Sequence, residues 1–214
     1  MINNNIVTAS EIAGKCQRNW LDEPIDEFDL ETIISSCMNM PTKQNVTMYE
    51  LLVVRDKNTI DFLYDTSYVP ELDIDVEGRW RNAQMKAPTV LMWYLSSQIK
   101  YEIPREDYSQ GIRNFSTTNF DNIKLNAGIS MGAAALTATQ LGYHVGFNCC
   151  GDNNEWVKLI QQKNPEIEGF ICALGIGKPI ENLPRNIIPT NKNISNDLVV
   201  PTEDHRKERI VHYI

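Results

Sequence analysis

Three runs of almost unbroken apolar residues predict strands in the core of the protein, at residues 49–54, 89–95 and 169–176. In the first two runs polar residues do not alternate with apolar ones, so we expect those strands to be buried on both faces. A shorter extended segment is predicted at residues 143–149. The turn-prone residues 56–58 are interpreted as the end of the first strand.

Apolar residues spaced three and four positions apart predict helices between these strands. One helix covers residues 29–38, with Asp29 as its N-cap and Pro41 just beyond its end. The longest candidate runs from 121 to 141 and is rich in Gly and Ala, which allow another helix to approach closely. It is therefore either a central core helix or a subunit interface. A surface helix is expected at 154–163.

The alternation of strands and helices predicts a single α+β domain over residues 1–214, built as a mixed α/β sandwich. The pattern changes near its end, because residues 178–203 are rich in Pro and Asn and have few regularly spaced apolar positions. We interpret this stretch as an extended arm that lies over a surface, with partial disorder as the alternative.

Composition and charge argue against several classes of protein. Of the 214 residues, 42% are hydrophobic, which is enough for a packed core, yet no apolar run is long enough to span a membrane. The net charge of −8 and the lack of a basic block disfavour nucleic-acid binding. No secretory signal is seen at the N-terminus, and the five cysteines form no zinc-like pairs. We therefore expect a cytoplasmic protein with reduced thiols, and the adjacent Cys149 and Cys150 leave a vicinal disulfide open.

The usual signatures of side-chain catalysis are missing. The sequence contains no GxGxxG after a strand, no GxxxxGK[ST], no HExxH and no GxSxG, and its three histidines lack metal-ligand spacing. We therefore predict no catalytic side chain and no metal site. An enzyme with this sequence would take its chemistry from a cofactor.

A basic stretch at residues 15–20, with the sequence KCQRNW, is the first of several segments that point to one family. It resembles the R-x-S-x-R/K-x-F/Y stretch of the nitroreductase family, whose side chains hold the phosphate and ribityl chain of FMN. Arg18 takes the second basic position and Cys16 that of the serine. Gly14 stands where the first arginine is expected, and Lys15 is the cation beside it. The resemblance implies that Lys15, Cys16 and Arg18 bind the cofactor.

The sequence PTKQN at residues 41–45 follows the first predicted helix and precedes the first predicted strand. It looks like the P-S/T-x-x-N segment of the same family, which lies against the flavin bound by the partner subunit. Hydroxyl and amide side chains supply the neutral donors and acceptors that a flavin edge needs. The resemblance thus implies that Pro41, Thr42 and Asn45 contact the flavin.

Two more segments resemble parts of the family that surround the flavin ring. Residues 81–88 resemble a stretch that reaches the pyrimidine side, where Gln84 takes a Lys/Gln position and would stabilise negative charge on the reduced ring. The long helix and the strand after it resemble the family's dimer helix and a strand that ends near the flavin. Phe147, Asn148 and Cys149 would line the ring there. Cys149 is interpreted as a small residue packed near the flavin, in preference to the alternative of a reactive thiol.

The last matches lie toward the C-terminus. Residues 173–179, ALGIGKP, resemble the exit of a family strand, and a basic cluster then precedes Ile-Val-His near the chain end. Family members return a Lys or Arg to the FMN phosphate at this point, which implies Arg206, with Arg185 as its rival.

Taken together, the resemblance implies a nitroreductase-like fold, with a central mixed sheet flanked by helices and an extended C-terminal arm. It also implies an intertwined homodimer with FMN at the interface. The implied activity is ping-pong transfer of hydride from NADH or NADPH to a small acceptor, such as an aromatic, quinone or nitro compound. Three alternatives stay open: a noncatalytic flavin-binding or regulatory protein, a flavin-destroying or dehalogenating enzyme of the same fold, and a small α/β interaction protein without a cofactor.

Overall fold

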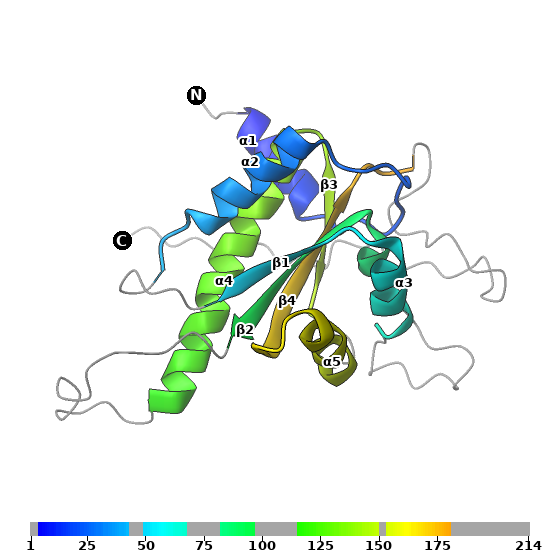
Figure 1. The fold of residues 1–214 in the computed structure, drawn as a ribbon. Coiled ribbons are helices and arrows are strands. Elements are labelled where there is room, and N and C mark those ends of the chain that lie inside the picture. Colours follow the sequence, from blue (N-terminus) through cyan, green and yellow to red (C-terminus); the bar gives the residue numbers. More distant parts are fainter. Residues whose placement is uncertain (1–3, 43–48, 68–81, 97–114, 150–152, 181–214) are drawn as a thin grey trace, which may run out of the picture.

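The computed structural model describes residues 4–42, 49–67, 82–96, 115–149 and 153–180 (Figure 1). Within this part of the chain a sheet of four strands runs in the order β1-β2-β4-β3, and every neighbouring pair is antiparallel. The predicted α+β class is confirmed, with antiparallel pairs among the described strands where a mixed sheet was expected. The strands are β1 (Glu50–Val54), β2 (Thr89–Ser96), β3 (His144–Asn148) and β4 (Ile167–Gly177).

The two middle strands, β2 and β4, carry the core of the sheet. Residues 90–93 of β2 are fully buried, and β2 pairs with β4 from Thr89, opposite Ile176, to Ser96, opposite Ile167. In β1, by contrast, residues 50–53 are only half-buried. The expectation of burial on both faces was wrong for those residues, because β1 lies at an edge and β2 is its one neighbour among the described strands.

Helices cover both faces of the sheet and give three layers (Figure 1). On one side of the sheet, which we call the α4 face, Trp93, Val145 and Leu174 pack against a first group of helices. The other, the α3 face, packs Met92 and Ala173 under shorter elements. The α4 face is covered by α1 (Asn4–Ala13), α2 (Glu27–Met38) and α4 (Phe115–Gln140), and the α3 face by α3 (Lys57–Asp65), the 3-10 helix η2 (Ala83–Lys86) and α5 (Asn153–Lys163).

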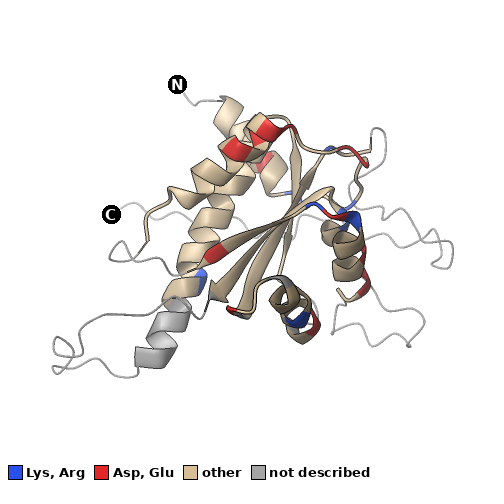
Figure 2. Ribbon diagram, in the orientation of Figure 1, with Lys and Arg blue, Asp and Glu red and all other residues tan. Residues whose placement is uncertain are grey.

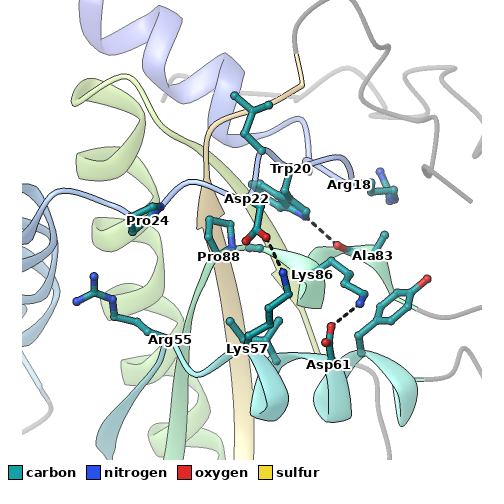
Figure 3. Close-up of a pocket in the computed structure, with 14 residues that line it drawn as sticks. Arg18, Trp20, Asp22, Pro24, Arg55, Lys57, Asp61, Ala83, Lys86 and Pro88 are labelled. Atoms are coloured by element: carbon teal, nitrogen blue, oxygen red, sulfur yellow. Dashed lines mark hydrogen bonds and ion pairs between the residues drawn. The ribbon is translucent and has the colours of Figure 1, made fainter. Parts of the chain in front are cut away.

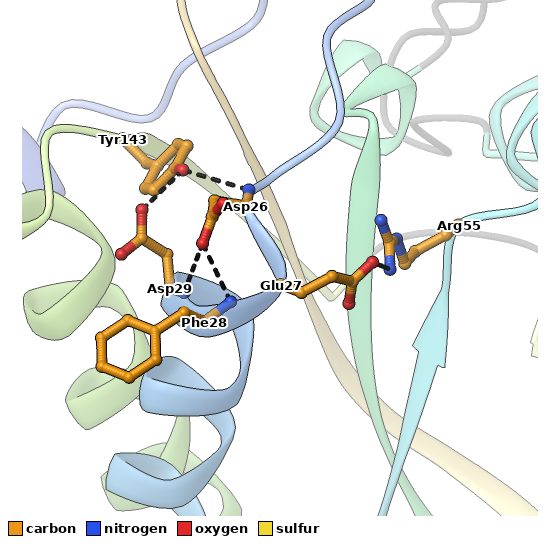
Figure 4. Close-up of polar contacts among 6 residues, drawn as sticks. All are labelled: Asp26, Glu27, Phe28, Asp29, Arg55 and Tyr143. Atoms are coloured by element: carbon orange, nitrogen blue, oxygen red, sulfur yellow. Dashed lines mark hydrogen bonds and ion pairs between the residues drawn. The ribbon is translucent and has the colours of Figure 1, made fainter.

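The start of α2 is set by a residue upstream of the predicted cap. Asp26 accepts hydrogen bonds from the backbone N–H groups of Phe28 and Asp29, at 2.9 and 3.3 Å (Figure 4). Asp29, which the sequence predicted as the N-cap, accepts a hydrogen bond from the Tyr143 hydroxyl at 2.8 Å instead. This bond, together with burial, raises the pKa of Tyr143, with burial as the larger cause. Asp29 therefore ties α2 to the start of β3.

The turn predicted at residues 56–58 is in fact the beginning of α3. The carboxylate of Asp56 accepts a hydrogen bond from the backbone N–H of Thr59 at 2.9 Å, which is the geometry of an N-cap. Helices α1 and η2 were also not predicted, and α4 begins at Phe115 rather than near residue 121. Of the residues 178–203 interpreted as an arm, those beyond 180 lie outside the described part of the chain.

A short chain of hydrogen bonds joins three elements inside the α4 face. The indole Nε1 of Trp93 in β2 donates to Oγ of Ser130 in α4 at 2.9 Å, and that hydroxyl donates to the carbonyl of Cys37 in α2, also at 2.9 Å. Trp93, Ser130 and Cys37 are each fully buried, at 0% exposed. One hydroxyl therefore satisfies a donor and an acceptor that water cannot reach.

We predict that Ser130→Ala destabilises the protein by about 1–3 kcal/mol, because it removes the acceptor of the buried Trp93 indole N–H and the bond from the Ser130 hydroxyl to the Cys37 carbonyl. Urea unfolding measures the change. Thr32→Ala is the matched control, since its hydroxyl donates to the Phe28 carbonyl on the exposed side of α2, and it is expected to shift stability by less than about 0.5 kcal/mol. Equal losses in the two variants would contradict this role of Ser130.

Candidate functional site

The 3-10 helix η2 lies directly on the backbone of β3 and β4 at positions that have no side chain. A Cβ on Gly175 would lie 2.1 Å from the carbonyl oxygen of Gln84, and one on Gly146 would lie 2.6 Å from Cγ of the same glutamine. Both distances are far below van der Waals contact, so the two glycines are needed for this approach. Gln84 is buried there, at 7% exposed.

A pair of amide side chains lies beside this contact. Nδ2 of Asn82 donates to Oδ1 of Asn148 at 2.6 Å, and the Asn82 side chain also accepts from the backbone N–H of Gln84 at 3.4 Å. Asn148 is 2% exposed. We call Asn82, Asn148 and Gln84, whose backbone N–H bonds to Asn82, the amide cluster; it lies on the α3 face and is built from the start of η2 and the end of β3.

The segment predicted to hold the cofactor phosphate runs along the opposite ends of the same strands. The backbone N–H of Gln17 donates to the carbonyl of Val145 at 2.8 Å, and that of Leu21 donates to the carbonyl of Lys178 at 2.9 Å. The indole N–H of Trp20 then donates to the carbonyl of Ala83 in η2 at 2.9 Å. Residues 17–21 are therefore fixed to β3, to the residue after β4 and to η2.

A cavity of about 480 Å³ opens where this segment meets α3 and η2 (Figure 3). Four basic residues and two acidic ones line it, together with aromatic and aliphatic walls that include Trp20 and Tyr64. Positive side chains thus outnumber negative ones on the lining of a protein whose net charge is −8. The charged residues of the lining are Arg18, Arg55, Lys57, Lys86, Asp22 and Asp61.

Most of these cations are held by exposed ion pairs around the cavity. Lys57 pairs with Asp22 at 2.6 Å and Lys86 with Asp61 at 2.5 Å (Figure 3). Lys86 also lies 4.7 Å from the centre of the Tyr64 ring. The hydrogen bond to Asp22 raises the pKa of Lys57, so this amine stays charged. Figure 2 shows basic residues at the N-terminal end of α3, beside the cavity.

Arg55, which follows β1, pairs with a residue that does not itself line the cavity. It pairs with Glu27 of α2 at 2.5 Å, so the first residue of α2 is joined to a residue of the cavity lining (Figure 4). Exposed pairs of this kind contribute little to stability, and their cations can exchange a carboxylate partner for an anionic ligand. The lining is therefore suited to a ligand that carries a phosphate or carboxylate on an apolar body.

The structure brings some of the predicted site residues together and separates others. Asn148 bonds to the Asn82 side chain, Gln84 bonds to it through its backbone N–H, and Arg18 lines the cavity. Phe147 packs against the core of the α4 face, so it lies on the other side of the sheet from Asn148. Cys149 follows β3 and is exposed.

The remaining predicted residues fall in three places. Lys15 is exposed and Cys16 half-buried in the turn after α1, where the Cys16 carbonyl accepts a bond from Arg18 at 3.2 Å. Pro41 and Thr42 follow α2, whose end lies across the molecule from α3 (Figure 1). The predicted Asn45 and Arg206, and the rival Arg185, lie outside the described residues.

Sequence reasoning missed Arg55, Lys57 and Lys86 as residues of the site. The apolar residues Ile60, Leu63 and Tyr64, spaced three and four apart, were the signal that could have revealed α3 and with it the cations at its start. Among the described residues, no helix is long and apolar enough to cross a membrane. The same part of the chain holds no group of three or more His, Cys, Asp or Glu that could bind a metal ion.

No protein-family model and no curated protein matches the sequence, but solved structures match the fold. NfrA2 of B. megaterium superposes with a TM-score of 0.63 at 19% identity, over 91% of this chain and 77% of that one. Nitroreductase A of Vibrio parahaemolyticus gives 0.61 at 15% identity, over 89% and 77%. A nitroreductase family protein of Streptococcus pneumoniae gives 0.61 at 16% identity, over 94% and 99%. The chain has the nitroreductase fold.

The nitroreductase fold confirms the resemblance that was inferred from the short segments of sequence. The likeness lies in the fold rather than in the sequence, since fewer than one residue in five is identical in these three neighbours.

We predict that Gly175→Ala destabilises the protein by at least about 1–3 kcal/mol, because the new methyl group overlaps the Gln84 carbonyl and η2 must move. Gly169→Ala in the same strand is the matched control. A Cβ at that position would lie 3.5 Å from Cδ1 of Leu95, an ordinary van der Waals contact, so the change is expected to be neutral or to stabilise the strand by up to about 0.5–1 kcal/mol. Urea unfolding of both variants measures the difference, and a neutral Gly175→Ala would show that η2 is not seated on β4.

Proposed function

We propose that this protein is an FMN-dependent oxidoreductase that passes hydride from NADH or NADPH to a small acceptor, such as an aromatic, quinone or nitro compound. The observation that carries the proposal is the amide cluster of Asn82, Gln84 and Asn148, which the nitroreductase fold assembles on two glycines. The neighbour from Vibrio parahaemolyticus is itself a nitroreductase by name. The cationic cavity next to the cluster is the second support.

The residues present fit a flavin nucleotide. Amide side chains both donate and accept, as the pyrimidine edge of a flavin requires. The phosphate needs cations, and in this acidic chain Arg18 stands among the four basic residues of the cavity lining. A guanidinium binds phosphate through strong charge-assisted hydrogen bonds. We therefore assign Arg18 to the phosphate and the amide cluster to the ring, with Lys15, Cys16, Pro41, Thr42 and Asn45 as the further proposed contacts.

FMN, when bound, supplies the hydride chemistry, so the protein needs no acid, base or nucleophile of its own. The work of the chain is to orient and to stabilise charge. The bond from Asn82 to Asn148 fixes both amide groups, and the backbone of Gln84 is fixed by the contact with Gly175. Preorganised donors of this kind stabilise negative charge that develops beside them at little cost in reorganisation.

We further propose that the protein is a homodimer and that α4 supplies part of its interface. Leu125 and Ile129 of α4 are 62% and 41% exposed. Gly128 and Gly132 lie on the same stripe of the helix, and nothing lies within 4 Å of a Cβ at either position. A stripe of small and apolar residues that its own protomer leaves uncovered suits a second copy of the helix.

The first test is the absorption spectrum of the protein with FMN, followed by NADH or NADPH without oxygen. We expect bound flavin that bleaches on adding a nicotinamide, and renewed colour on adding a quinone. Bound flavin that stays oxidised would favour the noncatalytic binding protein, and a protein that binds no flavin would overturn the proposal.

Arg18→Ala is expected to weaken FMN binding by about 10- to 100-fold, because it removes a charged hydrogen bond worth about 1.5–3 kcal/mol. Titration followed by flavin fluorescence measures the dissociation constant. Lys158→Ala on α5 is the matched control, since its amine pairs with Glu155 away from the cavity. If both variants bind FMN as the unaltered protein does, Arg18 does not hold the phosphate.

Gly128→Leu is expected to convert the dimer to a monomer without unfolding it, because nothing in its own protomer lies within 4 Å of a Cβ at this position. Light scattering after size exclusion measures the mass. Lys158→Leu adds the same side chain to α5, on the other side of the sheet, and should leave the dimer intact. A dimeric Gly128→Leu protein would place the interface elsewhere.

A further inference from the structure

The ladder between β3 and β4 places residues of the α4 face opposite each other in pairs. Val145 pairs with Ile176 and Phe147 with Leu174, and all four pack in the same apolar cluster. Side chains alternate along a strand, so the next pair on this face is two residues further on. Beyond the last ladder pair, Asn148 with Ala173, that position is taken by Cys149 and Cys172.

The two cysteines differ sharply in their surroundings. Cys149 is exposed, whereas Cys172 is buried at 4% exposed among the residues of the α4 face. Burial raises the pKa of Cys172 to about 12, and the charge of Cys149 adds to this shift. The electrostatic coupling agrees with the register in placing the two thiols close together. Cys149 can therefore meet a reagent from solvent, while Cys172 stays protonated behind it.

We propose that Cys149 and Cys172 are a reversible dithiol–disulfide pair that closes a bridge between the end of β3 and β4 in the presence of a small-molecule disulfide. Residues directly opposite each other in an antiparallel pair have Cα atoms about 4.5–5.5 Å apart. That spacing lies within the range of about 4.4–6.8 Å that a disulfide spans. The bridge therefore needs no rearrangement of the sheet.

The reaction takes two steps, and a disulfide of the form RSSR is the oxidant. The thiolate of Cys149 attacks one sulfur of RSSR, which releases RS⁻ and leaves a mixed disulfide on Cys149. The thiol of Cys172 then loses its proton to water and attacks the sulfur of Cys149, and the second RS⁻ leaves. Two protein thiols are oxidised to one disulfide, and RSSR is reduced to two thiols.

Two other cysteines are less suited to be the partner of Cys149. Cys37 lies in α2, where its thiol donates to the carbonyl of Ile34 at 3.2 Å, and it is fully buried. Cys16 precedes the segment that runs along the other ends of the strands. Cys150 lies outside the described residues, and a bridge between it and Cys149 is an outcome that the experiment tells apart.

The experiment treats the fully reduced protein with oxidised glutathione, blocks the remaining thiols and measures the mass of the intact chain and of its tryptic peptides. Trypsin cuts after Lys158 and Lys163, so Cys149 and Cys172 fall on different peptides, whereas Cys149 and Cys150 share one. We expect the chain to lose two hydrogen atoms and the two peptides to be linked. Dithiothreitol should reverse both changes.

Variants fix the order of the steps. Cys149→Ser should abolish the link, and Cys172→Ser should stop at a single glutathione adduct on Cys149, with Cys172→Ala as a second variant if the serine does not fold. Cys150→Ser and Cys37→Ser should keep the link. No linked peptides from the unaltered protein, a bridge within the peptide that holds Cys149 and Cys150, or a bridge that survives in Cys172→Ser would each overturn the proposal. None of these readouts depends on bound FMN.

Discussion

The contact between η2 and the bare backbone of Gly146 and Gly175 is the constraint on which the candidate site depends. With Gln84 seated on these glycines, the N-terminal end of η2 comes beside Asn148 and the carbonyl of Ala83 comes within reach of Trp20. The segment that carries Arg18 is then fixed between η2 and the ends of the strands. The amides that we propose bind the flavin ring and the cations that we propose bind the phosphate are thus placed by one packing contact. Such a close approach to a strand backbone leaves no room for a Cβ atom, so only glycine is tolerated at the contact position.

The charge of the cavity lining is opposite in sign to the net charge of the protein. The chain is acidic, yet basic residues from the 17–21 segment, the end of β1, the start of α3 and the end of η2 converge on one cavity. Carboxylates at its rim hold three of these cations in exposed pairs, which keeps like charges together in the absence of a ligand. Because such pairs are weak, a phosphate can replace the carboxylates without a large loss. An overall negative field with one positive cavity also favours anionic ligands that fit the cavity over extended polyanions.

The sequence was sufficient for most of the fold, and its failures have physical reasons. The helix at 29–38 was predicted from apolar residues three and four positions apart. The strands at 89–95 and 169–176 were predicted from nearly unbroken apolar runs, which arise because their side chains pack in a core on each face of the sheet. The helix α3 was missed because Asp56 is favourable both in a turn and at an N-cap. Which of the two forms depends on whether the apolar residues that follow pack against the rest of the protein. Short motifs singled out Arg18, which lines the cavity, and Gln84, whose backbone N–H bonds to Asn82; their part in binding FMN stays a prediction. The bond between Asn82 and Asn148, which are 66 residues apart, could not be predicted, since only the folded sheet brings them together. Likewise Phe147 and Asn148 were expected on one side of a ring, although neighbours in a strand point to opposite faces.

Because of that alternation, one face of β3 contributes to the polar cluster and the other face to the apolar core. Gly146 contacts η2 and Asn148 belongs to the amide cluster, whereas Val145 and Phe147 face the apolar core, and Cys149 follows on the same side as these two, toward Cys172. The proposed bridge therefore lies one residue from Asn148 but on the other face of the sheet, where it cannot collide with a ligand held by the amides. Its effect on the site would pass through the backbone: closing the bridge fixes the end of β3 against β4 and so restricts the residue that orients Asn82. A redox change on the α4 face can thus tighten the polar cluster on the α3 face, because a single strand supplies side chains to both.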